Sequence, residues 1–188
     1  ANTALGHQSM ISNTTGASNT AVGKEALKGN TTATENVAVG ATAGDALTTG
    51  SENVAIGSDA LSTATTNGNN VAIGRMALRV STAAGNTAVG HQSMISNTTG
   101  TSNVAVGKNS LDSNTTADNN TAVGYAALAA NTTGDNLVAV GKDALVDNTT
   151  GTTNVAVGQS ALRSNTTASN NVAMGYHSLY TNTTGDTN

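Results

Sequence analysis

A five-residue pattern, Asn-Val-Ala-Val-Gly, recurs along the whole chain and constrains its fold more than any other feature. It stands at residues 36–40, and related strings end at eleven glycines: Gly6, Gly23, Gly40, Gly57, Gly74, Gly90, Gly107, Gly124, Gly141, Gly158 and Gly175. Successive glycines are 17 residues apart, except for one spacing of 16 between Gly74 and Gly90. A fixed period of this kind is typical of a repeat architecture, in which each unit packs against its neighbours.

Counted from its Asn as position 1, the unit reads Asn-(Val/Thr)-Ala-(Val/Ile)-Gly-x-x-(Ala/Ser)-Leu-x-x-Asn-Thr-Thr-(Gly/Ala)-x-x. Alternation of β-branched residues about an Ala, ending at Gly, predicts a short strand at positions 2–4 followed by a corner. We expect the Ala-Leu pair at positions 8 and 9 to form a second short strand or a half-turn. The Asn-Thr-Thr-Gly segment is expected to form a third extended piece with its own turn.

Stacking of the units would place like residues above one another at about 4.8 Å per coil, which gives a rod roughly 50 Å long. Asn at positions 1 and 12 would then form amide ladders, and the two Thr hydroxyl ladders. The sequence therefore predicts an all-β fold, a parallel β-solenoid of eleven 17-residue coils in one repeat array over residues 1–188. Because solenoids need polar caps and none is apparent, we expect the array to be an excerpt of a longer fibre.

Three consecutive units depart from the consensus. In the third, the Ala-Leu pair stands three residues late, at Ala46-Leu47, and we expect the coil to absorb this shift. The fourth has Ala64 in place of the second Asn, and the fifth lacks one residue near Ser81. That deletion falls in the polar segment, where a loop would tolerate it.

The composition predicts a thin core. The chain has no Pro, Cys, Phe or Trp, and its large apolar residues are few and evenly spaced. Disorder would also suit a polar composition, but it does not require a register kept over eleven units. Because each coil buries little apolar surface, we expect chains to associate side by side. We hypothesise that the Ala at position 3, with the Gly, forms the face on which a neighbouring chain packs.

Charge and residue usage exclude several classes of function. A net charge of -4 and a pI near 5.1 argue against nucleic acid as a partner, since nucleic acid requires a basic face. The absence of Cys excludes disulfides and thiolate metal sites. No apolar run is long enough to span a membrane, and no signal peptide is visible.

No catalytic or metal-binding constellation is recognisable. The histidines His7, His91 and His177 stand in separate coils, and the acidic residues fall in different columns without the calcium-binding repeat pattern. We interpret the histidines as solvated surface residues. The chain is therefore expected to be non-enzymatic, with no catalytic residue, no cofactor and no metal.

The strand motif, as in residues 36–40 and 53–57, resembles the head repeats of trimeric autotransporter adhesins, and similar arrays occur in phage tail fibres. The resemblance covers all eleven units through the strand and the following Ala. It implies a left-handed parallel β-roll, a trimer of chains and a rod that displays a binding surface. The repeats of that family are shorter, and the Asn-Thr-Thr-Gly segment is an addition here.

The column directly after each Gly varies while its neighbours do not, as expected of an outward face. Among its residues, and among the only aromatics of the chain, the candidate contact residues are Lys24, Arg75, Lys108, Lys142, Tyr125, Tyr176 and Tyr180. Ordinary variation of solvated residues is the alternative interpretation. The Asn-Thr-Thr segments also match the glycosylation sequon, although structural repetition alone generates such matches.

The predicted function is a structural and adhesive fibre segment, a rigid extracellular rod on a cell surface or virion fibre. Its partners would be copies of itself, as a trimer or a filament, and a host-surface protein or glycan receptor. One alternative is a subunit of a self-assembling extracellular filament. Another is an ice-binding solenoid whose Thr columns order water. The competing interpretation of the same columns is a ladder of hydrogen bonds within the chain, which we favour.

Overall fold

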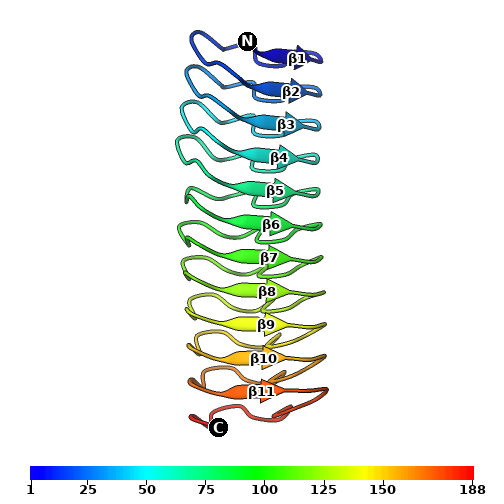
Figure 1. Ribbon diagram of the computed structural model, residues 1–188, viewed down its shortest axis with the longest axis vertical. Helices are drawn as coiled ribbons and strands as arrows, with labels where there is room; N and C mark the ends of the chain where they lie inside the picture. The colour runs from blue at the N-terminus through cyan, green and yellow to red at the C-terminus, as the bar shows by residue number, and fades with distance from the viewer.

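The computed structural model describes all of residues 1–188 as one column of stacked coils (Figure 1). Each coil contributes a single three-residue strand, and there is no helix. The strands are β1 Thr3–Leu5, β2 Thr20–Val22, β3 Val37–Val39, β4 Val54–Ile56, β5 Val71–Ile73, β6 Thr87–Val89, β7 Val104–Val106, β8 Thr121–Val123, β9 Val138–Val140, β10 Val155–Val157 and β11 Val172–Met174. The predicted parallel β-solenoid is confirmed, with the strand where the Val-Ala-Val alternation places it.

The strands form one parallel sheet in chain order, each paired in register with the next. Ala105 of β7, for example, lies opposite Ala122 of β8 and Ala88 of β6. The coil lacking one residue keeps this register, since Val71 still pairs with Thr87. In Figure 1 the strands face the viewer and run from left to right while the chain descends, so the solenoid winds left-handed.

Backbone pairing continues around the whole coil and is not confined to the sheet. Of 121 backbone–backbone hydrogen bonds, 20 lie within the strands and 101 elsewhere. In the Asn-Thr-Thr segment, for instance, the Thr115 N–H donates to the Thr132 carbonyl one coil further on. This segment forms no strand of its own, although we expected a third extended piece here. Its backbone nevertheless forms a ladder of hydrogen bonds from coil to coil.

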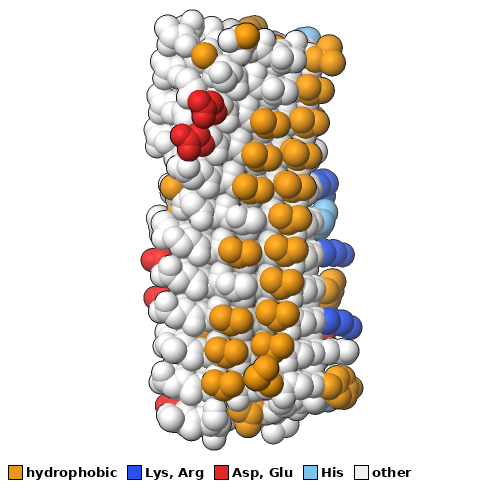
Figure 2. All heavy atoms as spheres, viewed as in Figure 1, with side chains coloured by type: hydrophobic (Ala, Val, Ile, Leu, Met, Phe, Trp, Pro, Cys, Tyr) orange, Lys and Arg blue, Asp and Glu red, His pale blue; other side chains and the backbone are white.

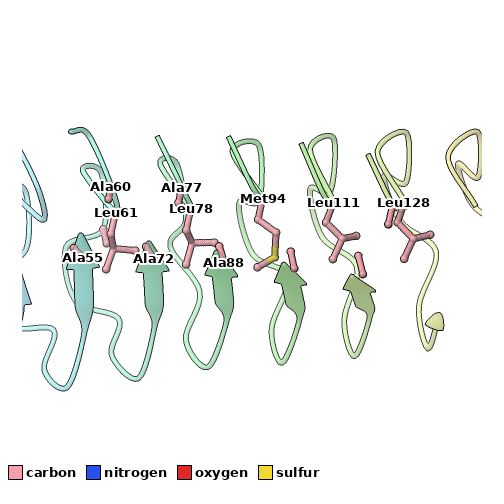
Figure 3. Packing of buried hydrophobic residues seen from close by; sticks show 14 of the residues in the cluster. Ala55, Ala60, Leu61, Ala72, Ala77, Leu78, Ala88, Met94, Leu111 and Leu128 are labelled. Carbon is pink, nitrogen blue, oxygen red and sulfur yellow. The ribbon is translucent and has the colours of Figure 1, made fainter. Parts of the chain in front are cut away.

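The interior holds the Ala of each strand and one large apolar side chain from the opposite wall. Leu61, Leu78, Met94, Leu111 and Leu128 point across the coil toward the strand alanines (Figure 3). The strand Ala is fully buried in the regular coils. Our hypothesis that this Ala packs against a neighbouring chain is therefore wrong: the coil is so narrow that only a methyl group fits beneath the Leu.

Two Asn columns supply the polar half of the interior, as predicted. At position 1, the Asn36 N–H donates to Asn19 Oδ1 at 2.9 Å, and Asn36 Nδ2 donates to the Gly50 carbonyl at 2.9 Å. At position 12, Asn148 Nδ2 donates to Asn131 Oδ1 at 2.9 Å and to the Gly151 carbonyl at 3.0 Å. Because buried amides must be hydrogen-bonded, these ladders let Asn occupy a core that is too thin for larger apolar residues.

The Ala-Leu segment forms a turn and not a strand. Residues at positions 7 and 9 have left-handed backbone conformations, as in Asn109 with φ 59° and Leu111 with φ 49°. A left-handed conformation costs a non-glycine residue about 1–2 kcal/mol. Hydrogen bonds to adjacent coils offset this cost, since the Leu111 N–H donates to the Ala127 carbonyl at 3.0 Å. Burial of the Leu side chain adds to the compensation.

The third coil shows an exchange of two side chains and no shift of the backbone. Gly44 occupies position 9 with the left-handed φ of 57° that Leu has in other coils, and Leu47 occupies the Asn position 12. A Cβ on Gly44 would lie 3.0 Å from Leu47 Cδ1 and 3.1 Å from Leu27 Cδ2. Leu47 therefore fills the space that the position-9 Leu would take, and our expectation that the coil absorbs a three-residue shift is wrong.

The glycine at position 5 sets the close approach of the coils. Gly107 has φ 140°, and a Cβ there would lie 2.6 Å from the carbonyl carbon of Gly124. No side chain fits that gap or readily adopts that φ. The recurring Gly is thus a requirement of stacking as well as of the corner.

Candidate interaction surfaces

Two columns of side chains run along the outer face of the sheet, and all of their members except Thr3, Thr20, Thr87 and Thr121 are apolar. They come from positions 2 and 4 of each strand, on either side of the inward-pointing Ala. We call this face the apolar stripe: Thr3, Leu5, Thr20, Val22, Val37, Val39, Val54, Ile56, Val71, Ile73, Thr87, Val89, Val104, Val106, Thr121, Val123, Val138, Val140, Val155, Val157, Val172 and Met174. Figure 2 shows one column as a nearly continuous orange band along the rod and the other as an interrupted band beside it.

The contrast within one strand is sharp: Ala105 is 0 % exposed, while Val104 and Val106 are each 37 % exposed. Single exposed apolar residues are normal, but a contiguous patch beyond a few hundred Å² marks an interaction surface. Sequence reasoning separated these two faces of the strand correctly but assigned the wrong one to the outside. The available clue was that position 3 is always Ala, whereas positions 2 and 4 vary among Val, Thr, Ile, Leu and Met.

The column after Gly, at position 6, lies on the corner that follows each strand, and we call it the corner column. Lys24, Arg75, Lys108, Lys142 and Tyr125 of this column are exposed, as predicted for an outward face. Tyr176, also in the column, is 70 % exposed. The structure places these residues one above another along the edge to the right of the apolar stripe in Figure 2.

Tyr180 is half-buried at position 10 and belongs to a small stacked group. The rings of Tyr176 and His177 stack with centroids 3.8 Å apart, and His177 lies 4.5 Å from Tyr180. The Arg163 guanidinium lies 5.9 Å from the centroid of Tyr180. Tyr125 stands three coils away, so the structure does not bring the three tyrosines into one cluster.

Charge is segregated across the rod. All seven Lys and Arg stand at positions 6 or 10, on the edge of the corner column. The opposite edge, at positions 16 and 17, carries five acids and no cation: Glu35, Glu52, Asp118, Asp135 and Asp186. Figure 2 shows basic side chains along one side of the apolar stripe and acidic ones along the other.

Ion pairs neutralise some of the cations. Lys24 Nζ lies 3.5 Å from Glu25 Oε1, and Lys142 Nζ lies 3.8 Å from Asp143 Oδ2. Lys28 donates a 3.3 Å hydrogen bond to Glu25, and this bond, with the positive charges of Lys28 and Lys24, lowers the pKa of Glu25. Arg163 and Asp147 approach to 3.9 Å. Arg75, Arg79 and Lys108 have no carboxylate within ion-pair distance.

The two threonines of the Asn-Thr-Thr segment behave differently. In nine coils the first Thr donates its hydroxyl to the backbone carbonyl of the first Thr of the next coil, as Thr115 does to Thr132 at 3.1 Å. The internal hydroxyl ladder is thus confirmed for this column. The second Thr, such as Thr116, is exposed and its hydroxyl bonds to no group of the chain, so the hydroxyl ladder predicted for this second column is wrong.

The sequon asparagines of the inner coils are buried. Asn30, Asn97, Asn114, Asn131, Asn148 and Asn165 are each 0 % exposed, and their side-chain amides donate hydrogen bonds inside the coil. A glycan attached to any of these asparagines would break the hydrogen bonds of its side-chain amide and would have to pass between the backbones of adjacent coils to reach the solvent. In the folded coil these asparagines are therefore structural.

His7 and His177 are exposed, His91 is half-buried, and no group of three or more His, Asp or Glu gathers where it could hold a metal ion. The structure has no cavity. None of its segments is a helix of the length and apolarity that crossing a membrane requires.

Comparisons with protein-family models, with curated proteins and with solved structures each give no match to this chain. The fold is thus described from its own geometry, as a parallel β-solenoid with coils of about 17 residues.

Proposed function

We propose that this chain is a non-enzymatic structural segment of an extracellular fibre, in which rods associate side by side through the apolar stripe. The observation that carries the proposal is the apolar stripe on the outer face of the sheet, whose position-4 column is Leu, Val, Ile or Met in every coil from β1 to β11 and whose position-2 column is Val in seven of these coils. Association would remove these side chains from water at about 25 cal/mol per Å² of apolar area. The thin Ala, Leu and Asn core gives a physical reason why such additional burial is needed.

Resemblance of the strand motif to head repeats of trimeric autotransporter adhesins and phage tail fibres supports a trimer on a cell surface or virion fibre. A flat stripe with two columns suits such an assembly, because the position-4 column of one chain can pack on the position-2 column of the next. The corner column would then remain at the outer rim, available to a host-surface protein or glycan. Self-assembly into long filaments is the alternative form of the same proposal.

Sedimentation equilibrium, with electron microscopy of the same sample, tests the proposal. We expect a discrete oligomer, three chains in the preferred form, seen as short rods. Replacement of Val106, Val123 and Val140 by Lys should release monomers that keep the circular dichroism of the wild type, because these side chains lie outside the coil. The matched control replaces the exposed Thr99, Thr116 and Thr133 by Lys and should leave association intact.

A monodisperse wild-type monomer would contradict the proposal, as would an oligomer that withstands the three stripe substitutions. Long filaments in the micrographs would replace the trimer by the filament form. Loss of association in the threonine control as well would mean that added charge alone, and not the stripe, disperses the rods.

The exposed column of second threonines supports one further candidate, adsorption to ice. Its hydroxyls recur in every coil except the fifth, where Ala83 follows Thr82, and they are free of internal bonds. The neighbouring position 16 is irregular, with Thr101, Asp118, Asp135 and Thr152 in successive coils, so the column stands alone. Thermal hysteresis in dilute solution tests this candidate, and its absence would reject it.

A further inference from the structure

The corner column contains a run of four residues that differs from the rest of the edge. Arg75, His91, Lys108 and Tyr125 stand at position 6 of four successive coils. Successive coils of a parallel sheet are separated by about 4.8 Å, so the run spans roughly 15 Å along the rod. It offers two permanent cations, an imidazole and an aromatic ring in one line.

The charges of this run are not neutralised by the chain. Position 7 carries Met76, Gln92 and Asn109 in these coils, where the coils of Lys24 and Lys142 carry the acids that pair with them. Arg75 Nη1 lies 3.5 Å from His91 Nε2, and neither Arg75 nor Lys108 has an ion-pair partner. Asp112, at position 10, is the only acid on this edge in coils five to seven.

Polar atoms around the same run also lack partners. His91 Nδ1, Asn109 Oδ1 and Arg79 Nε are buried and form no hydrogen bond within the chain. Only seven buried side-chain atoms in the whole chain are in this condition, so three of them gather along this part of one edge. Buried polar groups are normally paired, so these three atoms mark a part of the edge where the chain leaves its own polar groups unsatisfied.

We propose that Arg75, His91, Lys108 and Tyr125 form a binding site for a linear anionic glycan that lies along the rod. The cations would pair with sulfate or carboxylate groups spaced along the polymer, and the half-exposed Tyr125 ring would pack on the apolar face of a sugar. The site rests on the proposed function, because it supplies the receptor class for the outer rim of the fibre.

A glycan fits this edge better than nucleic acid does. The chain has a net charge of -4, and five acids occupy the opposite edge, so a dense row of phosphates would meet repulsion beyond the run. A glycan with fewer charges per unit length needs only the few cations that the run provides. The repeated spacing along the axis favours a polymer over a single small anion.

The experiment measures binding of a chondroitin sulfate hexasaccharide, which carries fewer sulfate groups per sugar than heparin, to the full chain by calorimetry at low salt. We expect Arg75→Gln with Lys108→Gln to weaken binding about tenfold or more, since two charge-assisted contacts are removed. The matched control, Lys24→Gln with Lys142→Gln, removes the same charge from cations that are already paired and should change binding less than about threefold. Tyr125→Ala should weaken hexasaccharide binding but not the binding of inorganic polyphosphate.

An equal loss of hexasaccharide affinity in the double variant of Arg75 and Lys108 and in the control variant of Lys24 and Lys142 would overturn the proposal. Net charge, and not the site, would then govern binding. So would absence of hexasaccharide binding by the wild type, or equally tight binding of a DNA duplex. Sedimentation of the same samples keeps the two proposals apart. The Arg75 and Lys108 variant should keep the oligomeric state of the wild type. If the stripe variant dissociates into monomers, its hexasaccharide binding still tests the glycan site separately from the association of rods.

Discussion

Two stretches of the solenoid fill the same interior position in different ways. From coil 7 to coil 11 position 12 is always Asn, and each carboxamide bonds to the coil before it, as Asn165 Nδ2 does to Asn148 Oδ1 at 2.8 Å. In coils 3 and 4 the position holds Leu47 and Ala64, and in the preceding coil the Oδ1 of Asn30 is buried without a partner. Yet β3, β4 and β5 pair in the same register as β8, β9 and β10.

The difference shows that the position-12 ladder is not what fixes the path of the chain. Backbone bonds between coils and the close approach of the position-5 glycines are common to both stretches. A large apolar side chain from the wall opposite the strand is also common to both, whether it starts from position 9 or from position 12. Space in the interior is therefore conserved more strictly than the residue that fills it.

The largest effect is expected at the corner and should be equal in both stretches. Gly107→Ala and Gly40→Ala each place a Cβ against the next glycine, 2.6 Å from the Gly124 carbonyl carbon and 2.7 Å from that of Gly57. Strain and overpacking together should lower the free energy of unfolding by about 3–6 kcal/mol. Urea denaturation followed by circular dichroism measures this loss.

Gly85→Ala is the control, because a Cβ at Gly85 meets nothing within 4 Å and its φ is 73°. We expect a cost of about 1 kcal/mol from the left-handed conformation alone. If Gly40→Ala lowers the free energy of unfolding much less than Gly107→Ala does, the two stretches also differ at the corner.

In the regular stretch, Asn131→Leu should cost about 2–5 kcal/mol. It removes the donor to Asn114 Oδ1 and the acceptor of the Gly134 N–H, and it crowds Leu128. Adding Leu128→Gly reproduces the arrangement of coil 3 and should recover at least about 1 kcal/mol relative to additive behaviour. A double-mutant cycle in urea measures the coupling, and strictly additive losses would reject the exchange of Gly44 and Leu47 as a compensated pair.

The reverse change in coil 3 should be smaller. Gly44→Leu alone would collide with Leu47 and Leu27, and overpacking of this kind costs about 1–3 kcal/mol. Leu47→Asn in the same chain removes the collision and gives Asn30 Oδ1 a donor, so the double variant should be more stable than the single one. Thermal unfolding of the two variants checks the order, and a double variant below the single one would contradict it.

The smallest effect is a pH dependence shared by both stretches. Burial raises the pKa of Asp45 in coil 3 and of Asp112 in coil 7, both at position 10. The folded state therefore holds these protons more tightly, and stability should fall as pH rises from the unfolded pKa of about 3.9 through the folded values. Partial exposure screens the effect, which should stay below about 1 kcal/mol.

Asp45→Asn with Asp112→Asn should remove this slope. The double variant is expected to be more stable than the wild type at pH 7, where both carboxylates are ionised, and equal to it near pH 3.5. Urea midpoints at several pH values test this prediction. A double variant that is less stable than the wild type at pH 7 would contradict it.

The sequence was sufficient for the period, the strand at positions 2–4 and the two Asn ladders. Strand residues 36–40 and their copies alternate in the way a short strand requires, and a 17-residue period permits only a stacked coil. The Asn columns follow from the same stacking, since in-register amides bond to one another. The corner column could likewise be recognised as outward from its variability.

The inside and outside of the strand could not be decided from alternation, because Val-Ala-Val is compatible with either face in the core. The tertiary structure decided it through the width of the coil, which admits an Ala methyl beneath Leu111 and leaves Val104 and Val106 outside. The same width made Leu47 a substitute for the missing position-9 side chain. Period and ladders are local and repeat with the sequence, whereas packing depends on how the walls of one coil meet.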